Sequence, residues 1–67
     1  MKIETAIIYQ KVIDTISKKE NLPVEIAKAI VDNNESWLID MVEAMDVTKV
    51  SYLAECIFDF HCDEVNN

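Results

Sequence analysis

The sequence predicts an all-α domain, a compact bundle of about four helices of which two are long and two are short. The chain of 67 residues has no glycine and a single proline, so the tight turns of β-hairpins are disfavoured. Apolar residues recur at spacings of three and four, which is the period of an amphipathic helix. A chain of this length also leaves no room for a second domain, and we expect residues 1–67 to form one.

The first predicted helix spans residues 3–19. One stripe of this helix is apolar and should face the core: Tyr9, Val12, Ile13 and Ile16. Its first turns carry three isoleucines off that stripe: Ile3, Ile7 and Ile8. Two interpretations are open, since the isoleucines could pack under the C-terminal helix or form the seam of a homodimer or of another partner contact.

A second, shorter helix is predicted over residues 23–33. Asn21 is a good helix stop, and Pro23 fits the first turn of the next helix because its missing N–H costs nothing there. The inward residues of this helix should be Val24, Ala27, Ile30 and Val31.

The third helix is predicted over residues 35–45. Asp32 with Glu35 has the form of a capping box at its start, although Asn33 or Asn34 could also cap it. Its apolar face should consist of Trp37, Leu38, Met41, Val42 and Met45.

The fourth helix is predicted over residues 48–63, because Asp46 and Thr48 are both competent N-caps, and residues 64–67 should fray. Its core stripe should consist of Val50, Leu53, Ile57 and Phe60. The first and fourth helices should supply most of the core, with Trp37 and Met41 closing it. Turns that need a positive φ must use Asn or Asp, since the chain has no glycine.

Charge is distributed unevenly along the chain. Residues 1–31 hold five lysines and four acids (+1), whereas residues 32–67 hold one lysine and nine acids (−8), giving the total of −7. In the fourth helix Glu55, Asp59 and Asp63 follow one another every four residues, a like-charged row that costs an isolated helix a few tenths of a kcal/mol per pair. An acidic field on an apolar frame favours a cationic partner and disfavours nucleic acid.

No catalytic, metal or cofactor motif stands out, so we expect a protein that is not an enzyme and binds no metal or cofactor. Cys56, His61 and Cys62 are residue types that zinc uses, but on a helix the two thiols lie about 120° apart and the imidazole falls on the apolar side. The chain also lacks a glycine-rich loop or an arginine for holding phosphate.

The sequence predicts a soluble, cytoplasmic protein, in the host cell if the chain is phage-encoded. Its N-terminus lacks the features of a signal peptide, and no stretch approaches the length of a membrane span. Cys56 and Cys62 would then be reduced thiols. A domain this small has a marginal core, so a partner chain, including a second copy, is the expected supplement.

Residues 37–60 resemble a helix-turn-helix unit in outline. The glycine usual in its turn is replaced by Asp46, and the second helix carries acids where phosphate contacts require Lys or Arg. A degenerate helix-turn-helix regulator that uses the lysines of the first half therefore stays an alternative.

The leading prediction is a small acidic inhibitor or regulator that docks on a basic protein, for example one that binds nucleic acid. The predicted contact residues, with carboxylates for steering and Tyr52 as the anchor, are Asp40, Glu43, Tyr52, Glu55, Asp59 and Asp63. In size and charge alone the chain is similar to phage-encoded inhibitors such as anti-CRISPR proteins and DNA mimics. The alternative from another class is a homo-oligomeric structural or regulatory module with Ile3, Ile7 and Ile8 as its seam.

Overall fold

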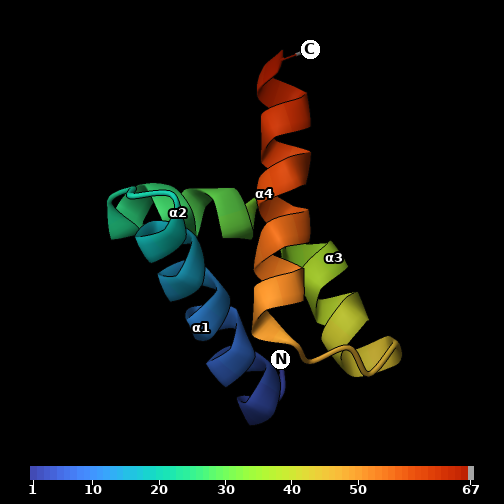
Figure 1. Ribbon diagram of the computed structural model, residues 1–67. Coiled ribbons are helices and arrows are strands. Elements are labelled where there is room, and N and C mark those ends of the chain that lie inside the picture. Colours follow the sequence, from blue (N-terminus) through green and yellow to red (C-terminus); the bar gives the residue numbers. More distant parts are fainter. Residues whose placement is uncertain (67) are drawn as a thin grey trace.

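The computed structural model describes residues 1–66 and shows an all-α fold (Figure 1). Its elements, in chain order, are α1 (Ile3–Lys19), α2 (Val24–Asp32), α3 (Glu35–Ile39), the π-helical turn η1 (Asp40–Ala44) and α4 (Val50–Asn66). The most extensive packing joins α1 to α4 and α1 to α2. The prediction of a bundle of about four helices is confirmed.

Two left-handed residues turn the chain, and neither is a glycine. Asn21 (φ 54°) follows α1, and Asp46 (φ 56°) follows η1. At the first turn the N–H of Leu22 donates to the carbonyl of Ser17 (3.0 Å), which satisfies an end carbonyl of α1. The expectation that Asn or Asp would occupy such positions is confirmed for residues 1–66. After glycine, these two residues adopt a positive φ most readily, since their short polar side chains can hydrogen-bond to the nearby backbone.

The ends of α4 differ from the prediction. The helix begins at Val50, two residues later than expected, and the carbonyl of Lys49 accepts the N–H of Leu53 (3.1 Å). Neither Asp46 nor Thr48 therefore sits directly before the helix. Residues 64–66 are helical rather than frayed, while Asn67 lies outside the described residues.

The predicted third helix is two segments, because its second half widens into the π-turn. The N–H of Met45 donates to the carbonyl of Asp40 (3.0 Å), five residues back, and the N–H of Val47 donates to that of Met41 (2.8 Å). The expected capping box is wrong, since no side chain caps α3. Asn34 precedes α3 and instead donates its side-chain amide to the carbonyl of Ile30 (3.0 Å), at the end of α2.

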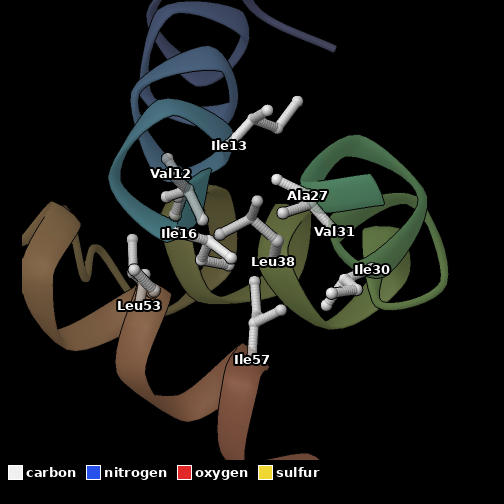
Figure 2. Packing of buried hydrophobic residues seen from close by; sticks show 11 residues of the cluster. Val12, Ile13, Ile16, Ala27, Ile30, Val31, Leu38, Leu53 and Ile57 are labelled. Atoms are coloured by element: carbon white, nitrogen blue, oxygen red, sulfur yellow. The ribbon is translucent and has the colours of Figure 1, made fainter. Parts of the chain in front are cut away.

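The core lies where α1, α2, α3 and α4 meet, and Leu38 sits among residues of the other three helices (Figure 2). Its buried members are Val12, Ile13, Ile16, Ala27, Ile30, Val31, Leu38, Val42, Leu53, Ala54 and Ile57. Tyr9, Trp37 and Met41 are only partly buried against this cluster. The long helices thus contribute the stripes that were predicted for them, with one exception in α4.

Three residues that the sequence placed in the core are exposed. Phe60 is 37% exposed and packs edge-on against Trp37, with ring centroids 5.1 Å apart. Met45 is 66% exposed because η1 ends just before it, and Val24 is exposed at the first residue of α2. In each case the residue lies at a helix end or at the border of the core, where periodicity alone does not fix the depth of burial.

A polar contact fastens α1 to α2. The Tyr9 hydroxyl donates to Asp32, which also accepts the Lys28 ammonium at 2.7 Å. The ammonium and then the hydroxyl hold the pKa of Asp32 below its ordinary value. Burial, followed by the hydrogen bond to Asp32, raises the pKa of Tyr9. The Asp32 carboxylate therefore binds side chains of α1 and α2 and does not cap α3.

Candidate protein-binding face

Three carboxylates follow one another along the exposed side of α4, and we call Glu55, Asp59 and Asp63 the acidic row. All three are exposed. Within residues 1–66 the one ion pair joins Lys28 to Asp32, so none of the three carboxylates belongs to an ion pair. The last turns of α4 extend past the other helices in the view of Figure 1. The row is therefore open to a partner along its length.

Tyr52 lies one turn before Cys56, at the edge of the acidic row. Its side chain is exposed, whereas the Cys56 thiol is half-buried and free. The Tyr52 phenol is neutral at physiological pH, and hydrogen bonding with the Cys56 side chain raises its pKa further above the ordinary value of 10.0. A neutral aromatic ring beside carboxylates can contact both apolar and cationic groups of a partner.

A small hollow lies between the end of α1 and the middle of α4, beside the acidic row. Its volume is about 150 Å³, and its lining residues are Ile16, Lys19, Glu20, Ala54, Glu55, Phe58 and Asp59. Ile16 and Ala54 are buried, so they form its base, while Glu55 and Asp59 are exposed at its edge. Lys19 of this chain stands at the same hollow. An apolar base with carboxylates at its edge suits an aliphatic stem that ends in a positive charge. The sequence contains no local signal for this hollow, because its two walls come from helices far apart in the chain.

Glu43, expected on a solvent face, is turned toward α1. Its Oε2 accepts hydrogen bonds from the Thr5 hydroxyl (2.6 Å) and the Lys2 backbone N–H (3.1 Å). Thr5 is only 1% exposed, and its hydroxyl has no other partner among the hydrogen bonds of residues 1–66. These two bonds, that from Thr5 first, hold the pKa of Glu43 below its ordinary value. Glu43 thus fastens η1 to the start of α1.

Asp40 is exposed at the first residue of η1. The structure therefore groups Glu55, Asp59, Asp63 and Tyr52 on one helix and leaves the two acids of η1 on a separate element.

The isoleucines at the start of α1 divide into two groups. Ile3 is 81% exposed and Ile7 51%, whereas Ile8 is partly buried against the core. The structure therefore brings Ile3 and Ile7 together on one exposed face, which we call the isoleucine patch, and places Ile8 elsewhere.

The cysteines and the histidine of α4 do not converge. Cys56 and Cys62 are both free and half-buried, and His61 lies against Phe58 with ring centroids 5.9 Å apart. Over residues 1–66 no three His, Cys, Asp or Glu side chains come together in a way that could hold a metal ion.

The chain matches no protein-family model, no curated protein and no solved structure. None of the helices in residues 1–66 combines the length and the hydropathy needed to cross a bilayer.

Proposed function

We propose that this chain is a non-enzymatic protein-binding domain whose α4 face docks on a basic surface of another protein and thereby inhibits or regulates it. The observation that carries the proposal is the unpaired acidic row beside the hollow. Helix α4 holds four acids and no lysine or arginine, so its charge is −4. Long-range attraction by such a face speeds the approach of a cationic partner and repels other acidic molecules.

A basic side chain of the partner has a defined place on this face. The aliphatic stem of a lysine or arginine fits over Phe58 and Ala54 in the hollow, and its charged end then meets Glu55 and Asp59 at the edge. Removal of one partner of such a pair leaves the other charge unpaired at the interface, which lowers the affinity. The hollow therefore supplies the anchor, and Asp63 with Tyr52 extends the contact along the helix.

The spacing of the carboxylates favours docking by individual pairs over full imitation of DNA. Four residues of an α-helix rise about 6 Å, so the row carries one charge per about 6 Å. One strand of DNA carries a phosphate for every 3.4 Å or so of helix axis. A DNA-binding site is thus one basic surface that the row could occupy, and the partner class is a basic protein rather than nucleic acid itself, whose phosphates the row repels.

The proposal is tested by affinity capture from a lysate of the organism that encodes the chain. The bait is the tagged protein, compared with the Glu55→Lys, Asp59→Lys variant and with a matched Glu25→Lys, Glu64→Lys control. Each substitution adds two charges, so both variants move the net charge from −7 to −3. Glu25 and Glu64 are exposed and lie off the row.

The proposal predicts a protein that the wild type and the control retain at low salt, and that the row variant and a high-salt wash both release. If both variants lost the partner equally, net charge alone would explain the binding, and the position of the acidic row would not matter. Recovery of the bait alone would contradict the proposal.

A further inference from the structure

The isoleucine patch lies on the side of α1 that faces away from the core. Ile3 and Ile7 are four residues apart and therefore neighbours on one face of the helix. The core residues Val12 and Ile16 each follow one of them by nine residues, which is a rotation of about 180° around the helix. The patch is thus a second apolar surface of α1, on the opposite side from the one that packs on α4.

Two opposite charges flank Ile7 on the same side of the helix. Glu4 precedes Ile7 by three residues and Lys11 follows it by four, so the two charges are seven residues, or about two turns, apart. Both are exposed, and neither belongs to an ion pair within residues 1–66. The order acid, isoleucine, lysine is self-complementary when a second helix runs antiparallel across it.

We propose that α1 pairs with α1 of a second copy of this chain, antiparallel about a two-fold axis near Ile7. The two-fold axis brings Glu4 of each copy beside Lys11 of the other and places Ile7 of both copies at the centre, while Ile3 of each copy lies at the two ends of the contact. The contact ends at Gln10 and Asp14, whose side chains hydrogen-bond to each other (3.1 Å) and continue the same face as a polar surface.

The distribution of charge argues for a second copy as the occupant. Helix α1 holds three lysines and two acids, so its net charge is only +1 and the repulsion between two copies of it is small. A contact through α4 would instead oppose two helices of charge −4. Pairing through α1 also leaves the acidic row free, so this inference does not rest on the proposed function, and each can fail without the other.

The test is the mass of the protein in solution over a concentration series, measured by sedimentation equilibrium up to about 1 mM. The wild type should reach the mass of a dimer. The Ile3→Ser, Ile7→Ser variant should raise the dissociation constant at least about tenfold. The matched control is Val24→Ser, Ile26→Ser, which removes two exposed apolar side chains from α2. It should leave the constant unchanged, and circular dichroism should show the same helix content for all.

Charge exchange tests the antiparallel register. Glu4→Lys and Lys11→Glu should each weaken self-association, because each places like charges across the axis. A mixture of the two single variants restores both crossing pairs, so the mixture should associate more tightly than either alone. A wild type that stays monomeric throughout, or a mixture that associates no better than its components, would overturn the proposal.

Discussion

Helices α1 and α4 have the same length and pack on each other, yet their free surfaces differ. Each has 17 residues, and each contributes a buried stripe to one core. Outside that stripe α1 carries charges of both signs and exposes Ile3 and Ile7, while α4 carries only negative charge. The shared core constrains one face of each helix and leaves the other face free to differ: it carries charges of both signs on α1 and only negative charge on α4.

The largest expected effect comes from breaking the core that the two helices share. Ile57→Ala in α4 and Ile16→Ala in α1 should each lower the free energy of unfolding by about 2–5 kcal/mol, because both side chains are fully buried. A domain of this size has about 3–10 kcal/mol in total, so either variant should be partly unfolded. Urea titration followed by circular dichroism measures the loss. Val65→Ala, on the exposed part of α4, should change stability by less than about 0.5 kcal/mol.

A smaller effect is expected from removing the hydrogen bond that joins α1 to η1, a contact that has no counterpart on α4. Thr5→Val keeps the shape of the buried side chain and removes the hydroxyl that donates to Glu43, so it should cost about 1 kcal/mol. Thermal unfolding at neutral pH measures it. Thr15→Val is the control, since the Thr15 hydroxyl bonds to Lys11 within α1. An equal loss in both variants would show that Thr5 does not fasten α1 to η1.

The same contact predicts a dependence on acid. The folded-state pKa of Glu43 lies below its ordinary value of 4.5, chiefly because Thr5 donates to its carboxylate. The contact therefore stabilises the fold above pH 4.5, and this contribution disappears as the pH falls through the folded-state value. Free energies of unfolding measured between pH 7 and pH 3 should fall less in Thr5→Val than in the wild type. Parallel curves would contradict this prediction.

The two helices should also differ in how their tyrosines contribute to stability at alkaline pH. Burial and the bond to Asp32 raise the pKa of Tyr9 in α1, and contact with Cys56 raises the pKa of Tyr52 in α4. A tyrosine whose pKa is raised by folding stabilises the fold below its ordinary value of 10.0, and this contribution is lost as the pH rises above it. Tyr9→Phe should therefore remove more of the alkaline loss of stability than Tyr52→Phe does, because Tyr9 is half-buried. The reverse order would contradict the prediction.

The smallest effect concerns the acidic row itself. Neutralising its central member with Asp59→Asn relieves repulsion from Glu55 and Asp63, so the free energy of unfolding should rise by a few tenths of a kcal/mol. Lys11→Gln on α1 relieves no such repulsion and should not stabilise the protein. High-precision urea titration at low salt measures both. A loss of stability in Asp59→Asn would show that the row is not maintained at a cost.

Much of this architecture is visible in local sequence patterns, and the exceptions have physical causes. The stripe of Val12, Ile13 and Ile16 predicts α1 to its last residue, since 17 residues give several turns of periodicity and Asn21 marks the stop. The span of residues 35–45 is too short for periodicity to settle which side faces inward. In the structure Leu38 and Val42 are buried, Trp37 and Met41 are partly buried beside them, and Met45 is exposed.

The candidate site is predicted only in part. The spacing of Glu55, Asp59 and Asp63 within one helix predicts the acidic row, because a single helix fixes their alignment. The bond between Thr5 and Glu43 joins residues 38 apart in the chain, and no local pattern reports such a contact. The hollow beside the row likewise depends on how α1 crosses α4.

The proposed binding by the α4 face depends on the position of its charges and not on their sum. It is tested by the affinity of the purified chain for its captured partner, at low and high salt, for the wild type, the Glu55→Lys, Asp59→Lys variant and the Glu25→Lys, Glu64→Lys control. The row variant should lose on the order of 10- to 100-fold in affinity, the control should keep most of it, and salt should weaken binding by the wild type. Equal losses in both variants, or an affinity indifferent to salt, would contradict it.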